Sequence, residues 1–230
     1  MKKFIFGFIT FLSAFTIYTI LILFIFKWIN PPTTAFIQQN NSTTFKSILE
    51  IKKVEQVWMP LNKISNEIKI AVITSEDQRF LDHWGFDVIQ IQKVIEDQID
   101  GKRLRGASTI TQQVAKNLFL YSDKFWVRKI LESYYTVLIE LIWSKQRIFE
   151  VYLNIAEFGE NIYGVEAASS FYFKKSSTYL NSREGAMIAS ILPNPVKFNL
   201  RRINKYLEKR IDRILEESKN LDRAKIVEYL

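Results

Sequence analysis

The most constraining feature of this sequence is a long apolar stretch near its start. From Phe4 to Phe26 no residue carries a charge, and Phe, Ile and Leu predominate. A helix needs about 20 such residues to cross the hydrocarbon core of a bilayer, so this stretch is long enough to span it. A cleaved signal peptide is the alternative, but its apolar region usually has only about 7–15 residues before a cleavage site of small residues. Because the stretch is longer and is followed by Lys27 to Pro31, we expect an uncleaved anchor over residues 1–27.

Lysines lie on both sides of the apolar stretch. Lys2 and Lys3 precede it, and Lys27 follows it. Cytoplasmic ends of membrane spans carry an excess of Lys and Arg, so the two N-terminal lysines favour a cytoplasmic N-terminus. Lys27 weakens this preference without reversing it. We therefore expect a single-pass protein whose remaining residues lie outside the cytoplasm.

Length, charge and cysteine content narrow the possible functions. The 230 residues leave room for one anchor and one soluble domain. The absence of cysteine excludes disulfides and thiolate metal sites, and the single histidine, His83, excludes a site with several histidine ligands. The net charge of +8 indicates an anionic partner: nucleic acid, an anionic membrane surface or a phosphorylated substrate.

Residues 28–53 are expected to form a linker, and residues 54–230 one helical domain. The linker contains Pro31, Pro32 and a polar run from Gln38 to Thr44, which is typical of an extended connection. Beyond it, apolar residues recur at helical spacing, and long alternating strand patterns are absent. These residues include Ile64, Ile68, Val72, Val88, Ile91, Ile95, Ile99, Leu131, Tyr135, Leu138, Ile142, Ile148, Val151, Met187, Ile188 and Ile191. With only seven glycines and five prolines, the domain is predicted to be mainly α-helical.

Four segments carry polar and charged residues that ordinary helices do not need. They are Glu76 to Asp87, Arg105 to Asn117, Arg128 to Glu132 and Ser144 to Phe173. In the second, a basic loop leads into a helix start rich in hydroxyls and amides. Ser108 or Thr109 is a plausible N-cap there, and free backbone amides at that helix start would favour an anionic ligand.

Each of these features has an ordinary alternative. An acidic residue such as Glu76 at a helix end is usually only solvated. Arg128 and Glu132 have the i, i+4 spacing of a stabilising helix pair worth about 0.3–0.5 kcal/mol. A single histidine is more often a hydrogen-bonded structural residue than a base. The polar residues of the second segment could form a solvated helix face.

Taken together, the segments resemble the signature of the peptidoglycan glycosyltransferases, a family found alone or fused to penicillin-binding transpeptidase domains. The resemblance covers roughly residues 54–200 and includes five motifs in the family's order. The motifs are E-D-x-x-F-x-x-H-x-G-x-D (Glu76, Asp77, Phe80, His83, Gly85, Asp87), G-x-S-T-I-T-Q-Q-x-x-K-N (Gly106 to Asn117), R-K-x-x-E (Arg128, Lys129, Glu132), K-x-x-I-x-E-x-Y-L-N (Lys145 to Asn154) and L-P-N-P (Leu192 to Pro195).

Departures from the family pattern are few. Ala107 replaces a frequent second glycine, and Gly185 stands where the family often has alanine. Because Gly185 lies in a helical pattern, we expect it to cost about 1 kcal/mol relative to alanine. No Ser-x-x-Lys motif occurs, so we expect no transpeptidase domain. The closer match is therefore to the monofunctional branch of the family.

The resemblance implies a fold and a location. The expected fold is a lysozyme-like, mainly α-helical domain with a smaller hydrophobic lobe that faces the membrane, preceded by one transmembrane helix. Residues 84–99 and 118–127 would supply the smaller lobe, unless they are ordinary core. Their aromatic and basic residues suit a membrane interface about as well as a core. The anchor would lie in the inner (cytoplasmic) membrane, with the catalytic domain on the periplasmic side.

The resemblance also implies an activity. The family polymerises lipid II, a lipid-linked disaccharide-peptide, into β-1,4 glycan strands by inverting transfer and releases polyprenyl diphosphate. Glu76 would be the general base, and Glu132 would be the second catalytic carboxylate. Substrate would be bound by Ser108, Thr109, Gln113, Lys116, Asn117, Arg128 and Lys129, several of them facing the diphosphate. Asp77, Phe80 and His83 would brace the first loop.

No cofactor is expected. A divalent cation such as Mg²⁺ or Mn²⁺ bridging diphosphate and carboxylate would suit the chemistry, but the sequence supplies no obvious metal site. The expected partners are lipid II, the growing lipid-linked glycan, the membrane and proteins of wall synthesis or division.

Three other classes of function compete with this interpretation. A lysozyme-like wall hydrolase or lyase shares a catalytic glutamate but has no diphosphate to bind, which argues against it because Lys116 and Arg128 are present. A non-catalytic wall-synthesis scaffold would be expected to lose Glu76 or Glu132. A nucleic-acid binder is disfavoured by the anchor, which places the domain outside the cytoplasm.

Overall fold

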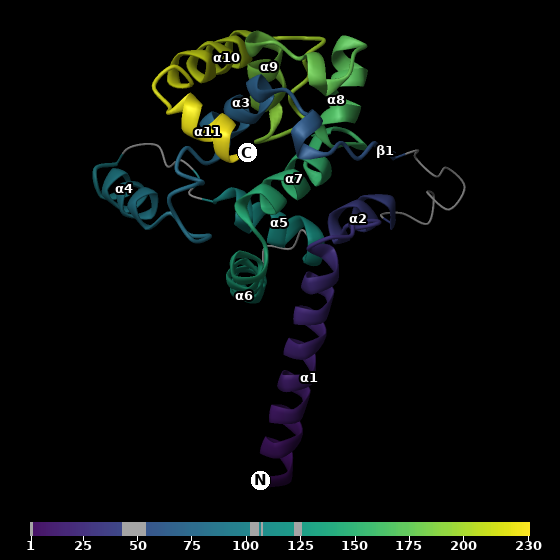
Figure 1. Ribbon diagram of the computed structural model, residues 1–230. Coiled ribbons are helices and arrows are strands. Elements are labelled where there is room, and N and C mark those ends of the chain that lie inside the picture. The colour runs from purple at the N-terminus through teal and green to yellow at the C-terminus, as the bar shows by residue number, and fades with distance from the viewer. Residues whose placement is uncertain (1, 43–53, 102–105, 107, 122–125) are drawn as a thin grey trace.

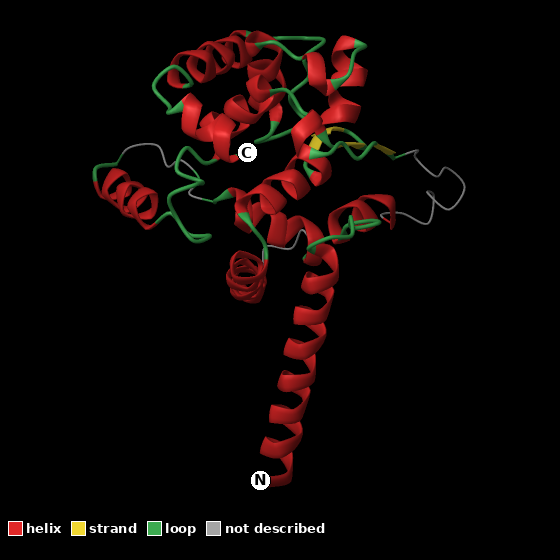
Figure 2. Cartoon of the chain, viewed as in Figure 1, coloured by secondary structure: helices red, strands yellow, loops and turns green. Residues whose placement is uncertain are grey.

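The computed structural model describes residues 2–42, 54–101, 106, 108–121 and 126–230. Helices dominate this part of the chain, and the strands are short (Figure 2). The prediction of a mainly α-helical protein is therefore confirmed. Most of the basic loop before the second motif and residues 122–125 of the expected smaller lobe lie outside the described residues.

Helix α1 (Lys2–Phe26) projects from one end of the molecule (Figure 1). It is long and apolar enough to cross a membrane. Phe4, Phe6 and Phe11 near its free end are 82%, 73% and 69% exposed, whereas Leu23 near its other end is fully buried. The half of α1 nearest the domain therefore packs against protein on one side, whereas the half with the free end is exposed.

The segment after α1 is not wholly extended. Helix α2 (Ala35–Ser42) forms where the sequence predicts an extended connection over Gln38 to Thr44, of which Gln38 to Ser42 is described. The Thr34 hydroxyl accepts a hydrogen bond from the Ile37 amide at 3.0 Å, and Ile37 is 5% exposed. The helix packs beside α5. A helix cap and one buried side chain outweigh the polar composition that favours an extended chain.

One group of helices lies farthest from α1 and contains α3 (Asn66–Glu76), α9 (Ser182–Ile191), α10 (Lys205–Glu217) and α11 (Arg223–Tyr229). Helix α3 begins after Ser65, whose hydroxyl accepts a hydrogen bond from the Glu67 amide, and its residues from Ile68 to Thr74 are buried. It packs closely on α9 at Gly185, where a Cβ would lie 3.0 Å from the Glu67 carbonyl oxygen. Gly185, which costs helix propensity, thus lies where the backbones of α3 and α9 meet.

A second group lies between the first group and α1 and contains α5 (Ile110–Phe119), α6 (Trp126–Ile142) and α7 (Lys145–Ile155), whereas α8 (Val165–Phe173) lies beside the first group (Figure 1). Two 3-10 turns, η1 (Leu61–Lys63) and η2 (Ser177–Tyr179), complete the connections. Strands β1 (Glu55–Gln56), β2 (Glu157–Gly159) and β3 (Ile162–Tyr163) form a small sheet in the order β1-β3-β2. The β1–β3 pair is parallel and the β2–β3 pair antiparallel.

Helix α4 (Val88–Ile99) lies at the side of the molecule (Figure 1), and none of its residues is buried. Val88, Ile95 and Ile99 are 59%, 52% and 79% exposed, and Trp84 just before the helix is 73% exposed. The alternative that residues 84–99 are ordinary core is therefore wrong for this helix, because it presents its apolar side chains to the outside.

The other segment expected in the smaller lobe is mixed. Leu118 and Leu120 are each 6% exposed and belong to the protein interior, whereas Tyr121 and Trp126 are 58% and 65% exposed. Of the described residues in this segment, the first three are therefore core, and Tyr121, Trp126 and Val127 make the exposed apolar surface.

Candidate active site

Glu76 is the last residue of α3, where the helix ends and its side chain can be reached from other elements. One carboxylate oxygen accepts a hydrogen bond from the Gln113 amide nitrogen at 3.1 Å, and the other accepts one from the Ser75 hydroxyl at 2.8 Å. The Arg210 guanidinium lies 3.5 Å from the second oxygen. We call Glu76, Ser75, Gln113 and Arg210 the Glu76 centre. Its carboxylate is 12% exposed and is held mostly by neutral donors.

Gln113 is oriented by a buried tyrosine. The Tyr152 hydroxyl donates to the Gln113 side-chain oxygen at 3.2 Å, which leaves the Gln113 NH₂ group to face Glu76. Burial raises the pKa of Tyr152 well above its ordinary value, and the negative charges of Glu76 and Asp77 raise it further. Tyr152 therefore stays protonated and acts as a donor throughout the pH range in which proteins are folded. The orientation of the Gln113 side chain is fixed over the same pH range.

Arg210 is a residue of the site that the sequence analysis missed. It lies on α10 and donates to the Ser190 carbonyl at 3.1 Å and to the Ser75 hydroxyl at 2.8 Å. Burial lowers the pKa of its guanidinium, and Glu76 opposes this shift. Arg210 lies 134 residues from Glu76 in the sequence and outside the five motifs, so only the tertiary structure brings the two together.

Glu132 lies in the middle of α6, and its surroundings are cationic. The residue is 3% exposed. The Arg128 guanidinium donates to one carboxylate oxygen at 2.8 Å, and the Lys129 ammonium donates to the other. We call Glu132, Arg128, Lys129 and Lys116 the Glu132 centre. The Arg128–Glu132 pair at i, i+4 is present, as expected for an ordinary stabilising helix pair. It differs from a solvated surface pair because its carboxylate is buried.

Lys116 on α5 connects the two centres electrostatically. Burial lowers the pKa of its ammonium, Glu132 and Glu76 each raise it, and Arg128 and Lys129 lower it. The side chain is half-buried, so its charge is less screened than that of a surface lysine. Three cations therefore gather around one buried carboxylate, which leaves a surplus of positive charge for an anionic ligand.

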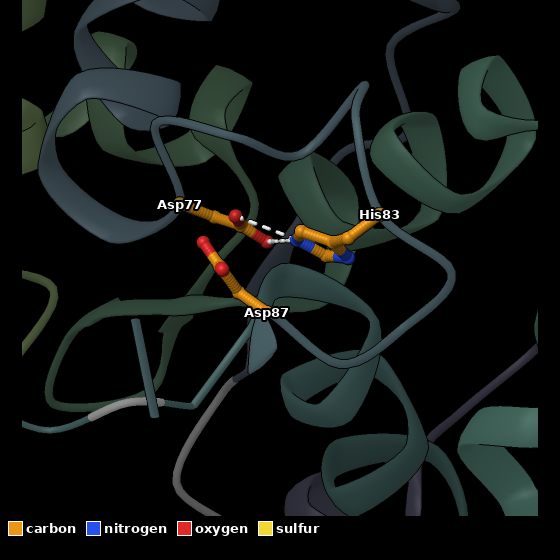
Figure 3. A group of neighbouring side chains, drawn as sticks. All are labelled: Asp77, His83 and Asp87. Atoms are coloured by element: carbon orange, nitrogen blue, oxygen red, sulfur yellow. Dashed lines mark hydrogen bonds and ion pairs between the residues drawn. The ribbon is translucent and has the colours of Figure 1, made fainter. Parts of the chain in front are cut away.

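Asp77, the residue after Glu76, forms a buried pair with His83. The His83 Nε2 atom lies 2.9 and 3.1 Å from the two Asp77 oxygens (Figure 3), so it carries the proton that the carboxylate accepts. Both side chains are at least nine-tenths buried. The Ile110 amide donates to Asp77 Oδ2 at 3.0 Å. These contacts tie the first motif's loop to the start of α5, which supports a bracing role for Asp77 and His83.

Asp77, His83 and Asp87 are close enough to be considered as metal ligands, with donor atoms within 4.8 Å of one another (Figure 3). Both Asp77 oxygens already accept hydrogen bonds, and Asp87 Oδ1 accepts one from the Gln90 amide at 2.9 Å. His83 Nδ1 is buried and has no hydrogen-bond partner among the described residues, but in Figure 3 it lies on the ring edge away from the two carboxylates. The donor set therefore fits a hydrogen-bonded brace and not a metal site.

The start of α5 differs from the expectation. Thr109 is the N-cap: its hydroxyl accepts a bond from the Gln112 amide at 3.2 Å, and its own amide donates to the Gln112 side chain at 3.0 Å. The Ile110 amide is taken by Asp77. The expectation that free amides at this helix start bind an anion is thus wrong for Thr109, Ile110 and Gln112, because the chain's own oxygen atoms already occupy them.

Thr109 also holds the first motif in place. Its hydroxyl donates to the Gly85 carbonyl at 2.6 Å. Gly85 has φ +77°, and a Cβ there would lie 2.6 Å from a Thr136 methyl group. Thr109 is 2% exposed, whereas Ser108 beside it is exposed. Of the two hydroxyls predicted to bind substrate, only Ser108 is accessible.

The remaining predicted residues occupy different depths. Phe80 is fully buried, packs against Phe149 with tilted rings whose centres are 5.7 Å apart, and lies under the Lys145 ammonium, which is 4.5 Å from its ring centre. Asn117 is 8% exposed on α5. Phe80 supports the first motif from the core, as a bracing residue should. Asn117 lies one residue beyond Lys116 on the same helix.

Comparison with known proteins agrees with this arrangement. The model of the family described as "Transglycosylase" matches residues 41–219, which contain all the site residues named above. A protein of Pseudomonas putida (strain W619) named biosynthetic peptidoglycan transglycosylase is 43% identical over 192 residues, covering 84% of this chain and 81% of its own length. A protein of Pasteurella multocida with the same name is 46% identical over 187 residues, covering 81% and 76%. One of Stutzerimonas stutzeri is 39% identical over 203 residues, covering 88% and 84%.

Proposed function

Because the chain belongs to the transglycosylase family and is a peptidoglycan glycosyltransferase that polymerises glycan chains, we propose that it does so from lipid II at a membrane surface. The domain is lysozyme-like, as the family resemblance implies. The observation that carries the proposal is the pair of carboxylate centres with opposite surroundings, connected by Lys116.

The Glu76 centre is suited to proton transfer. In the proposed step, the 4-hydroxyl oxygen of one disaccharide bonds to the anomeric carbon of the growing chain, and its proton passes to Glu76. The carboxylate receives hydrogen bonds from the neutral Gln113 and Ser75 side chains, and the nearest cation, Arg210, lies 3.5 Å from one of its oxygens. Gln113 and Ser75 fix its orientation, so little reorganisation is needed during the reaction.

The Glu132 centre is suited to the leaving group. When the new glycosidic bond forms, the bond from the anomeric carbon to the diphosphate oxygen breaks, and the diphosphate keeps the electron pair. Lys116, Arg128 and Lys129 supply three positive charges against the single charge of Glu132. Positive charge placed where negative charge develops lowers the barrier of the reaction. Glu132 holds two of these cations in place before substrate binds.

A single displacement of the diphosphate inverts the configuration of the anomeric carbon. An α-linked donor therefore gives a β-1,4-linked strand. Gln113 and Asn117 on α5, with exposed Ser108, are proposed to contact substrate beside the cations. Thr109 serves as the helix cap and has no hydroxyl to spare, so its contribution is to position α5.

The apolar surfaces support a membrane location. Helix α1 is proposed to be an uncleaved anchor in the inner membrane, with Lys2 and Lys3 in the cytoplasm and the catalytic domain in the periplasm. The exposed apolar side chains of α4, together with Tyr121 and Trp126, are proposed to contact the bilayer. The head group of a lipid-linked substrate would then reach both centres while its lipid chain stays in the membrane.

The direct test is incubation of the full chain with purified lipid II in lipid vesicles, followed by separation of polymer from precursor. Polymer that a muramidase digests is the expected product. Finished, lipid-free peptidoglycan serves as the control substrate, from which the protein should release nothing. Release of soluble fragments from that control, with lipid II left intact, would establish a hydrolase instead.

A further inference from the structure

The end of α1 nearest the domain is held by side chains from a distant part of the sequence. The last four carbonyls of a helix have no partner within the helix and need donors from elsewhere. The Trp143 indole nitrogen donates to the Leu23 carbonyl at 2.7 Å. The Arg147 guanidinium donates to the Phe26 carbonyl through two nitrogens, at 3.0 and 2.9 Å, and to the Ile29 carbonyl at 3.0 Å.

Arg147 also connects this end of α1 to the rest of the domain. It donates to the Asn30 side chain at 3.0 Å and to Glu150 at 2.6 Å, and its guanidinium lies 5.4 Å from the ring centre of Trp58. The second Glu150 oxygen accepts a bond from the Leu61 amide at 3.0 Å. The Arg147 side chain is 11% exposed. A guanidinium has donors in a fixed planar fork, so contacts on several sides determine its position.

A second set of contacts lies further down α1. Thr19 and Leu23 are 3% and 0% exposed, and both lie on the face of α1 that meets α6. Phe15 stacks on Tyr134 with ring centres 5.9 Å apart, and Tyr135 hydrogen-bonds Thr19. Positions 15, 19 and 23 follow one helix face. Helix α1 is therefore fixed along one side as well as at its end.

From these contacts we infer that Arg147 and Trp143 are positioning residues that make the anchor a rigid support, which sets the height and tilt of the two catalytic centres above the membrane. A flexible tether would keep the domain near the bilayer but leave its orientation free. Helix α6 carries Arg128, Lys129 and Glu132 and also contacts α1, so the orientation of the anchor is passed directly to the Glu132 centre. The inference rests on the proposed use of a membrane-bound substrate.

Rigidity can be measured without any activity. The chain has no cysteine, so two introduced cysteines give unique spin-label sites. Phe11 on α1 and Tyr179 in η2 are 69% and 73% exposed and serve as the label positions. In lipid nanodiscs we expect one narrow distance distribution for the doubly labelled chain. Adding Arg147→Ala should broaden it. The same distribution with and without Arg147→Ala would overturn the inference.

Activity tests the consequence for catalysis. With lipid II in vesicles, Arg147→Ala should lower the polymerisation rate by about tenfold, because small misplacements of reacting groups have large effects on rate. With lipid II dispersed in detergent micelles, the rate should stay within about twofold of wild type, since substrate there can approach from any direction. Arg147→Lys should behave like the alanine variant in vesicles, because an ammonium cannot reach the same set of acceptors.

Two further variants separate positioning from folding. Arg183→Ala removes an exposed arginine far from α1, with a side chain 58% exposed, and should leave both measurements unchanged. Trp143→Phe removes the indole donor to Leu23 together with part of the buried ring, and should broaden the label distances less than Arg147→Ala does. Equal loss in vesicles and in detergent for Arg147→Ala would show a folding defect and refute the positioning role. Wild type that makes no polymer in either medium would refute the proposed function, while the distance measurement would still decide the rigidity.

Discussion

The two carboxylate centres use the same functional group in opposite surroundings. Glu76 ends a helix, is partly accessible and receives hydrogen bonds from a serine and a glutamine, with a guanidinium at 3.5 Å. Glu132 lies within a helix, is buried, and is paired with Arg128 and Lys129. A carboxylate held by neutral groups can still accept a proton, whereas one paired with two cations mainly organises positive charge.

Under the proposed function, each centre has a separate part of one reaction. A hydrolase needs the first centre but has no diphosphate for the second. The comparison therefore predicts that variants of the two centres fail in different ways. The comparison would be refuted if variants of the two centres showed the same loss of rate, the same pH dependence and the same change in melting temperature.

The largest effect is expected for Glu76→Gln. The substitution keeps the shape of the side chain and removes its basicity, so polymerisation should fall by about 10²–10⁴-fold. The melting temperature should change by less than about 3 °C, because Arg210 keeps its hydrogen bonds to the Ser190 carbonyl and the Ser75 hydroxyl. Turnover of lipid II and circular dichroism on the same preparation measure both quantities. More than about a tenth of the wild-type rate would contradict the role of Glu76 as the base.

The next largest effect is expected at the Glu132 centre. Lys116→Ala and Arg128→Ala should each lower polymerisation by about 10²–10³-fold, since each removes a cation that stabilises the departing diphosphate. Arg128→Lys should restore part of the rate, because an ammonium provides charge without the paired donors of a guanidinium. Arg128→Ala should also lower the melting temperature slightly, because Lys129 remains as a partner for buried Glu132.

The sequence alone predicts the family and the fold of this chain. The five motifs and the residues Glu76, Lys116 and Glu132 were predictable because each motif is a local pattern with fixed spacing. The family and the mainly α-helical, lysozyme-like fold are confirmed. The roles of individual site residues stay predictions until the variants are measured.

Contacts between distant segments could not be predicted. Arg210 lies in an ordinary charged helix, and nothing in its local sequence indicates that it approaches Glu76. The composition of the first turn of α5 favours the binding of an anionic ligand. The Ile110 amide there instead donates to the carboxylate of Asp77, which follows the end of α3. Gly185 is unfavourable for α9 by helix propensity alone, but the α3 backbone packs against it and leaves little room for a Cβ. In each case, the deciding partner is far away in the sequence.

A smaller effect, on pH dependence, should appear for Lys116→Arg. Burial lowers the pKa of Lys116, so as the pH rises this lysine loses its charge before an ordinary surface lysine would. The polymerisation rate of wild type should therefore fall on the alkaline side, because neutral Lys116 cannot hold the diphosphate. Arginine keeps its charge, so the variant should retain its rate to higher pH, whatever its rate at neutral pH. A Glu76→Asp variant, if active, should keep the wild-type alkaline limb.

The smallest effect is expected outside both centres, for Gly185→Ala. Helix propensity alone would raise stability by about 1 kcal/mol. The added Cβ, however, would lie 3.0 Å from the Glu67 carbonyl oxygen, and overpacking of this kind usually costs about 1–3 kcal/mol. We expect a net decrease of a few degrees in melting temperature, roughly 2–4 °C per kcal/mol, with the polymerisation rate unchanged. A higher melting temperature would show that α3 and α9 can separate slightly.

The junction at the end of α1 has a consequence for the order in which the molecule is built. Arg147 follows Phe26 by 121 residues, so a ribosome has to make most of the domain before the contact can exist. At about 5–20 residues per second, the anchor waits roughly 6–24 s in the translocation machinery or the bilayer for its partner. The carbonyls at its end must be hydrated or bound by other donors during that time. Closure of the junction therefore requires α7 but not α8 to α11, so the anchor can be fixed to the domain before the last helices are made.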